Sequence, residues 1–154
     1  MKICGYLKKD HIFFDLKSTV KQDILEEFVA GLEERGFVNE PDVILSELLQ
    51  REKLCSTGLE KGIAVPHALT NAVSSPLLAL AVLRNGVNFG AVDEKPTYVL
   101  LLLLGNKDNP GFQLKVLAHI CRMVKETSFV ERVRDAESAS EVCRIITDEE
   151  GKME

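Results

Sequence analysis

Two long apolar segments constrain the fold of this chain more than any other feature of its sequence. Residues 77–83 and residues 97–104 are apolar almost throughout, without the polar and apolar alternation of a half-exposed strand. Continuous apolar runs of this kind are typical of central strands that are buried on both faces. Since helices must then cover both faces, the sequence predicts an α/β fold, a three-layer sandwich with one mixed β-sheet flanked by helices.

Three shorter segments predict further strands. Residues 11–16 and residues 63–65 are mostly apolar, and residues 86–90 form a short segment punctuated by glycines. The expected order along the chain is a strand, two helices, a group of strands and then more helices. This order also favours helices on both faces of one sheet.

Capping and breaking residues predict two helices between the first two strands. Thr19 begins a capping box at the start of the first helix, and Gly36 is the expected stop. Asn39 is the expected cap of the second helix, with Pro41 in its first turn. The second helix should end near residue 53.

The C-terminal third of the chain predicts helices. Asn109 and Pro110 begin the first of them, and capping boxes at Ser128 and Ser138 each precede a short helix. Residues 148–154 are polar, and we expect them to fray. The apolar stripe of the first helix is expected to contain Leu114, Leu117, Ala118, Cys121 and Val124.

Composition excludes several classes of protein. The 154 residues are most simply one domain, residues 1–154. Hydrophobic residues make up 45% and charged residues 28%, which excludes a disordered chain, a collagen and a coiled coil. The 19 basic and 24 acidic residues give a net charge of −5. Nucleic-acid readers usually carry a basic excess, so we expect no general binding to DNA or RNA.

No segment predicts a membrane span or a secretory leader. The longest apolar run, residues 99–104, is far shorter than the 20 or so residues of a spanning helix. The first ten residues lack the long apolar stretch of a secretory signal. We therefore expect a cytoplasmic protein without membrane insertion. Its four cysteines form no C-x-x-C pair, and we expect reduced, buried packing residues at Cys4, Cys55, Cys121 and Cys143.

His67 is the one histidine whose sequence context suggests chemistry. It follows a short apolar strand and a proline, and a loop rich in glycine and hydroxyl residues precedes that strand. A side chain just beyond a strand end tends to lie at the mouth of an α/β sheet, where ligands bind. Ser56, Thr57 and nearby backbone N–H groups are candidates to hydrogen-bond an anion there. We expect structural roles for His11 and His119.

The segment that ends at His67 resembles the motif of a known family. Residues 51–67 have the sequence REKLCSTGLEKGIAVPH, with an arginine, a Ser-Thr-Gly and a Gly-Ile-Ala-aliphatic-Pro-His. This resembles the enzyme IIA domain of the fructose/mannitol class of the bacterial phosphoenolpyruvate-dependent sugar phosphotransferase system. That class includes the nitrogen-regulatory IIA proteins. The similarity continues at residues 88–91, 93, 95–96 and 114–118, and covers about residues 11–147.

The resemblance implies that the chain carries a phosphoryl group on a histidine. His67 occupies the position that family members phosphorylate, and Arg51 matches an arginine of the family's active site. The phosphoryl group would come from the histidine of the carrier protein HPr and would pass to an EIIB domain, or mark a regulated target. A neutral imidazole, with a pKa near 6.5, has the free lone pair that an acceptor needs. Arg51 and Thr57 can donate to phosphate oxygens, and no metal or cofactor is implied.

Gln113 departs from the family pattern. Family members usually have a second histidine at this position, at the start of a helix. Glutamine can donate a hydrogen bond to a phosphate oxygen, but it cannot become cationic. His119 cannot fill the same place, because it lies about 120° round the helix and about 9 Å along its axis. Glu60 and Lys61 also place charge where small or amide residues are commoner, which can alter the choice of partner.

Two functions stay open at this point. One is a phosphocarrier for sugar phosphorelay or nitrogen-type regulation, and its free-standing domain favours the nitrogen-regulatory kind. The alternative is a non-catalytic regulatory binding module that keeps the fold but is phosphorylated poorly or not at all, which Gln113 favours. A metal site is not expected, because His67 has no ligand partner near it in sequence. The glycine loop before it matches neither the P-loop nor the dinucleotide pattern. The sequence does not identify the sugar or the oligomeric state.

Overall fold

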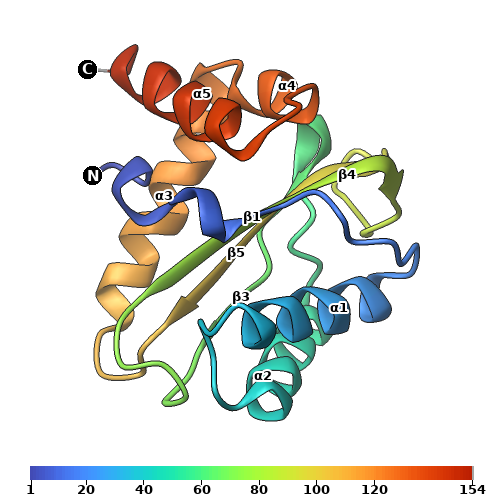
Figure 1. Ribbon diagram of the computed structural model, residues 1–154, viewed down its shortest axis with the longest axis vertical. Helices are drawn as coiled ribbons and strands as arrows, with labels where there is room; N and C mark the ends of the chain where they lie inside the picture. The colour runs from blue at the N-terminus through green and yellow to red at the C-terminus, as the bar shows by residue number, and fades with distance from the viewer. Residues whose placement is uncertain (154) are drawn as a thin grey trace.

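The computed structural model describes residues 1–153, which contain five α-helices and one five-stranded sheet (Figure 1). Three short 3-10 helices, η1 (Cys4–Tyr6), η2 (Lys9–His11) and η3 (Glu60–Gly62), complete the described part. No helix in this part is long and apolar enough to cross a membrane. The longer elements are, in chain order, β1 (Ile12–Phe13), α1 (Lys21–Glu34), α2 (Pro41–Leu54), β2 (Ile63–Ala64), β3 (His67–Leu69), β4 (Leu77–Val87), β5 (Thr97–Gly105), α3 (Pro110–Glu126), α4 (Phe129–Arg134) and α5 (Ala139–Gly151).

The antiparallel pair β4 and β5 forms the centre of the sheet. Leu80 pairs with Leu101 in this ladder, and Ala81 pairs with Leu100. β1 pairs with β4 in parallel on one side, and β2 and β3 pair with β5 in parallel on the other. The side chains of residues 78–83 and 99–104 are buried on both faces. The two apolar runs therefore are the central strands, as predicted.

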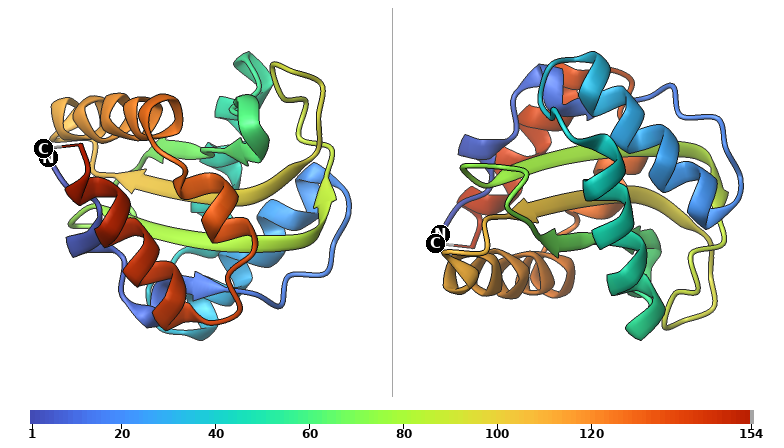
Figure 2. Two further views of the ribbon diagram at one scale, coloured as in Figure 1. Left: turned by 90° about the horizontal axis from the view of Figure 1, so that it is seen from above. Right: turned by 90° about the horizontal axis from the view of Figure 1, so that it is seen from below.

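Helices cover both faces of the sheet (Figure 2). On one face, Ala79, Leu100 and Leu102 pack into a core with the apolar side chains of α1 and α2. On the other face, Leu80 and Leu101 pack with α3, α4 and α5. The predicted three-layer α/β sandwich with a mixed sheet is confirmed.

β2 and β3 form one edge of the sheet that is interrupted at Pro66. The carbonyl oxygen of Pro66 accepts the Leu103 N–H at 3.0 Å, while its ring nitrogen has no hydrogen to donate. The Val65 N–H turns away from β5 to the Thr57 carbonyl oxygen. His67 follows the end of β2, as expected, but it is also the first residue of β3, paired with Leu103, which the sequence did not predict.

The predicted side-chain caps of the first two helices do not form. α1 begins two residues after Thr19, and no side chain caps it. Instead, the Glu27 carboxylate accepts the backbone N–H groups of residues 17 and 18. Glu27 lies in the second turn of α1, and these bonds fix the segment that leads into the helix. Glu40, rather than Asn39, precedes α2, and it makes no side-chain cap either.

Other predicted helix boundaries are confirmed. Gly36 follows α1 with a φ of 84°, and Pro41 is the first residue of α2. Asn109 caps α3 and Ser138 caps α5, each by accepting a backbone N–H three residues on. Ser128 precedes α4 as expected, but its side chain makes no capping bond.

The C-terminal segment is not the frayed tail that its polar residues suggest. Of the expected tail, residues 148–151 belong to α5 and residue 154 lies outside the described residues; both Glu149 and Glu150 are only 2% exposed. The Glu150 carboxylate accepts the backbone N–H groups of Ile3 and Cys4 at 2.6 and 2.9 Å. Its Oε2 also lies 2.6 Å from Nε2 of His119, whose structural role is thus to tie α3 to both ends of the chain.

The buried face of α3 differs from the predicted stripe. Leu114 is 68% exposed, and Ala118 and Cys121 are also exposed, so these three positions were wrongly assigned to the core. Both the predicted stripe and the buried stripe have the spacing of one face of a helix. The buried stripe includes a polar residue, Gln113, so a search for apolar residues alone does not find it. The buried residues are Gln113, Val116, Ile120, Met123 and Val124.

The expected strand at residues 86–90 is not separate. Gly86 and Val87 end β4 beyond a bulge, and residues 88–90 form a loop. Gly86 has a φ of 73°, and a Cβ there would lie 2.9 Å from the Tyr98 ring. The first strand is likewise shorter than expected, since β1 contains only two residues.

The cysteines are less buried than expected. Cys55 and Cys121 are exposed, and Cys4 and Cys143 are partly exposed. All four are free thiols. Burial raises the pKa of the Cys143 thiol above its ordinary value, so this side chain is neutral at pH 7.

Candidate functional site

The loop of residues 55–62 joins α2 to β2 and then lies along the outer side of that strand. The Thr57 carbonyl oxygen accepts the Val65 N–H at 3.0 Å, and Gly58 makes an isolated antiparallel bridge to β2. Gly58 has to be a glycine, because a Cβ there would lie 2.8 Å from the Cα of Ala91. The loop is therefore held tightly against both β2 and the segment after β4.

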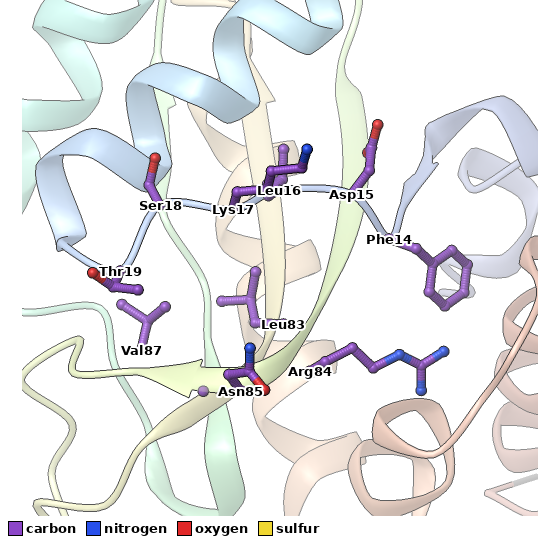
Figure 3. A pocket seen from close by; sticks show the side chains of 11 residues that line it. Phe14, Asp15, Leu16, Lys17, Ser18, Thr19, Leu83, Arg84, Asn85 and Val87 are labelled. Carbon is purple, nitrogen blue, oxygen red and sulfur yellow. The ribbon is translucent and has the colours of Figure 1, made fainter.

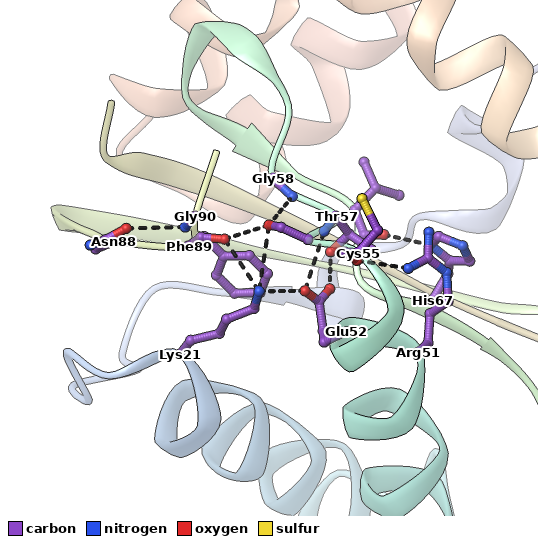
Figure 4. Close-up of polar contacts among 12 residues, drawn as sticks. Lys21, Arg51, Glu52, Cys55, Thr57, Gly58, His67, Asn88, Phe89 and Gly90 are labelled. Atoms are coloured by element: carbon purple, nitrogen blue, oxygen red, sulfur yellow. Dashed lines mark hydrogen bonds and ion pairs between the residues drawn. The ribbon is translucent and has the colours of Figure 1, made fainter. Parts of the chain in front are cut away.

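The ring of His67 is oriented by the backbone two residues before it. Nδ1 lies 2.8 Å from the carbonyl oxygen of Val65 (Figure 4). Because a carbonyl oxygen only accepts, Nδ1 must carry a proton and donate it. In the neutral ring, the lone pair that can act as a nucleophile is then on Nε2.

The surroundings of His67 favour the neutral ring. Burial lowers its pKa, and the nearby positive charge of Arg51 lowers it further. The bond to Val65 and the Glu52 carboxylate act in the opposite direction, yet the pKa stays below the ordinary value of about 6.5. At pH 7 most His67 rings are therefore neutral and able to react at Nε2.

Arg51 lies in the last turn of α2 and supplies positive charge beside His67 (Figure 4). Its Nη1 donates to the Cys55 carbonyl oxygen at 2.8 Å, a bond that closes the C-terminal end of the helix. This bond uses one of the five N–H groups of the guanidinium. The side chain therefore has the charge and the donors needed to hold an anion at His67.

The hydroxyl groups of Ser56 and Thr57 are already engaged within the protein. Ser56 donates to the carbonyl oxygen of Phe89 at 2.6 Å and accepts the Gly58 N–H at 3.1 Å. Thr57 is buried and donates its hydroxyl to Glu52. A direct bond from Thr57 to a phosphate oxygen therefore requires this partner to be exchanged.

Gln113 lies in the first turn of α3 and is only 6% exposed. Its Oε1 has no hydrogen-bond partner among residues 1–153. It packs against Gly105, where a Cβ would lie 2.6 Å from that oxygen. Gly105 is two residues beyond Leu103, the register partner of His67, and thus on the same face of the sheet. The structure therefore places Gln113 on the His67 face, with no hydrogen bond between the two among the described residues.

Glu52 and Lys21 are two site residues that the sequence analysis missed. Glu52 Oε2 lies 2.5 Å from Nζ of Lys21 and accepts the Thr57 N–H at 3.2 Å. Glu52 directly follows Arg51, so its place in the motif was a signal. Lys21 is 31 residues earlier in the chain, and no pattern in the sequence connects it to the site.

A separate hollow of about 300 Å³ lies between residues 14–19 and residues 83–87 (Figure 3). Lys17 and Arg84 line it, together with Asn85 and Thr19, but it holds none of the predicted site residues. Within residues 1–153, no group of three or more His, Cys, Asp or Glu side chains is arranged to hold a metal ion.

Comparison with known proteins shows which family this chain is similar to. The profile of the family described as "Phosphoenolpyruvate-dependent sugar phosphotransferase system, EIIA 2" matches residues 5–149. The fructose-specific EIIA component of Haloferax volcanii is 34% identical over 113 residues, which are 73% of either chain. The crystal structure of the nitrogen regulatory protein IIA-Ntr from Neisseria meningitidis superposes with a TM-score of 0.83 and 33% identity, over 94% of this chain and 98% of that one.

One relative is much longer than this chain. The fructose-specific EIIABC component of Bacillus subtilis is 27% identical over 146 residues, which are 95% of this chain but 23% of that protein. The chain thus spans about a quarter of that relative. With the family profile matched over nearly all of its length, this chain belongs to the EIIA 2 family of the phosphoenolpyruvate-dependent sugar phosphotransferase system.

Proposed function

We propose that this chain is a cytoplasmic phosphocarrier that accepts a phosphoryl group on Nε2 of His67. The donor is the phosphohistidine of an HPr-like carrier protein. The group then passes to an EIIB domain or serves as a mark that a regulated protein reads. The observation that carries this proposal is the bond from Nδ1 of His67 to Val65, which leaves the Nε2 lone pair beside Arg51.

The transfer is balanced without an external base. The bond from Nε2 of His67 to phosphorus forms as the donor's nitrogen–phosphorus bond breaks. The donor ring keeps the electron pair, and it leaves neutral when its other nitrogen already carries a proton. His67 keeps the proton on Nδ1, which donates a hydrogen bond to the Val65 carbonyl oxygen, so no proton has to leave the site. Arg51 stabilises the phosphoryl oxygens during the step.

Exposed apolar side chains near the site suit a carrier protein as the partner. Leu54 is 83% exposed and follows Arg51 by three residues. Leu114 is 68% exposed and follows Gln113 directly. Exposed apolar side chains of this size are available to pack against a protein partner.

The alternative function is a regulatory binding module that is phosphorylated poorly or not at all. The observation that favours it is Gln113, in the place of the family's second histidine, a neutral side chain whose Oε1 finds no hydrogen-bond partner in the described part of the chain. The oxygen of a glutamine amide can only accept hydrogen bonds, so Gln113 could bind phosphoryl oxygens only through its N–H groups. A phosphorylation assay distinguishes the two functions.

We expect incubation with phosphoenolpyruvate, enzyme I and HPr to add one phosphate to the protein, measured by intact mass. The added group should be stable to base and labile to acid, as a phosphoramidate is. His67→Ala should abolish the mass increase, because it removes the acceptor nitrogen. His11→Ala is the matched control and should be labelled normally. Unchanged labelling of His67→Ala would place the acceptor elsewhere, and no labelling of the unmodified chain would favour the binding module.

The rate of phosphorylation should rise with pH and then level off below pH 7. The lowered pKa of His67 means that protons compete for Nε2 only at pH values under about 6.5. Stopped-flow or quenched labelling between pH 5 and 8, with one preparation of phosphorylated HPr, measures this profile. The His67 ring titration, followed by NMR, serves as the control for changes in the donor. A plateau reached only above pH 7 would contradict a neutral His67.

Arg51→Ala should slow phosphorylation by about 10²–10³-fold, the usual effect of removing one preorganised charge donor. The melting temperature should change little, because the bond from Arg51 to Cys55 lies at an exposed helix end. Arg51→Lys keeps the charge without the forked donors, and its rate should be intermediate. A large fall in melting temperature would make Arg51 a structural residue.

Gln113→His should raise the phosphorylation rate, because an imidazole can become cationic beside the transferred group. Lys115→His is the control, since it places an imidazole on the exposed face of the same helix. Single-turnover labelling by phosphorylated HPr compares the three proteins. An unchanged or lower rate for Gln113→His would show that Gln113 does not contact the phosphoryl group.

A further inference from the structure

We infer that Lys21 and Glu52 are positioning residues that hold the carbonyl oxygen on which the His67 ring depends. The two side chains form an ion pair behind the loop of residues 55–58, on the far side from the His67 ring (Figure 4). This inference rests on the proposed function of His67 as the phosphoryl acceptor. The following observations carry it.

Glu52 is a buried carboxylate with every contact directed at the loop or at Lys21. Its side chain is only 6% exposed. One oxygen accepts the Thr57 hydroxyl, and the other accepts the Thr57 N–H at 3.2 Å and lies 2.5 Å from Nζ of Lys21. A carboxylate that is removed from water in this way needs such partners to remain charged.

A continuous chain of hydrogen bonds leads from Glu52 to the ring of His67. Glu52 holds both the N–H and the hydroxyl of Thr57. The Thr57 carbonyl oxygen accepts the Val65 N–H at 3.0 Å. The Val65 carbonyl oxygen accepts Nδ1–H of His67 at 2.8 Å. A shift of the loop at Thr57 is therefore transmitted to the oxygen that selects the tautomer of His67.

Lys21 joins the start of α1 to this loop and to the segment after β4. Besides Glu52, its Nζ lies 3.4 Å from Oγ of Ser56 and 3.3 Å from the carbonyl oxygen of Phe89. It also lies 4.6 Å from the centre of the Phe89 ring. Ser56 donates to the same carbonyl oxygen at 2.6 Å. One ammonium group thus connects three segments that are far apart in the sequence.

The ion pair also sets the charge next to the phosphoryl group. The charges of Arg51 and Glu52 both act on the pKa of His67: Arg51 lowers it and Glu52 raises it. With Lys21 present, the Glu52 carboxylate is paired. Removal of Lys21 leaves a buried, unpaired negative charge behind the ring that has to receive a doubly negative group. Loss of Lys21 should therefore displace the His67 ring and also change the fraction of His67 rings that are protonated.

The test combines His67 ring NMR with the rate of labelling by phosphorylated HPr, using the full chain. Lys21→Met and Glu52→Gln should each slow labelling by about 10–100-fold, as a displacement of around 1 Å does. Both should also reduce the fraction of His67 that carries its proton on Nδ1, measured from the ring nitrogen shifts. Lys21→Arg should restore both quantities, and Lys17→Met, which removes an exposed lysine nearby, should match the unmodified chain.

The outcomes separate this inference from the proposed function. If the unmodified chain is not labelled, the proposed function fails, while the ring NMR still tests the positioning role. If the chain is labelled and Lys21→Met changes neither the rate nor the His67 tautomer, the inference is wrong. A lower melting temperature with an unchanged tautomer would also overturn it, since that result describes a purely structural ion pair. Lys21 is 27% exposed, so Lys21→Met carries the test if Glu52→Gln does not fold.

Discussion

The hydrogen bond between Nδ1 of His67 and the Val65 carbonyl oxygen is the interaction on which the site depends. It fixes the tautomer of the ring, and the tautomer decides which nitrogen is nucleophilic. This carbonyl oxygen is free to accept from the ring because the backbone polar groups of Val65 point away from β5. The Val65 N–H, for example, donates to Thr57 and not to β5. Pro66 lies between the two residues and turns the edge strand so that the His67 ring meets the oxygen. The bond joins residues that are only two positions apart, yet it forms only because the edge of the sheet is interrupted at Pro66.

That edge is rigid because the centre of the sheet is buried on both faces. β4 and β5 have helices on either side, and β2 and β3 take their register from β5. A site that is built on such elements keeps its geometry better than one built on free loops. The loop of residues 55–58 is the exception, and it gains its order from bonds to β2 and to Glu52. The Lys21–Glu52 ion pair thus helps to hold this loop, which the sheet itself does not fix.

The sequence was most informative where one physical factor dominates. The two apolar runs predicted the central strands, since only full burial tolerates such runs, and Asn109 and Gly36 marked helix ends through local geometry. Predictions failed where a distant partner intervenes. Glu27 replaces the Thr19 cap, Glu150 orders the expected tail through Ile3, and the packing of α3 buries Gln113 rather than Leu114. At the site, the motif located Arg51 and His67, but Lys21 is paired with Glu52 only by the tertiary fold.

The position of the phosphoryl group on the ring is the most direct test of this account. Nitrogen and phosphorus NMR of the phosphorylated protein, labelled with ¹⁵N in histidine, measures which ring nitrogen is bonded to phosphorus. We expect a single phosphohistidine at His67, bonded through Nε2, with the proton on Nδ1 retained. A phosphoryl group on Nδ1, or on another residue, would contradict it, because Nδ1 is the nitrogen that the Val65 carbonyl oxygen holds.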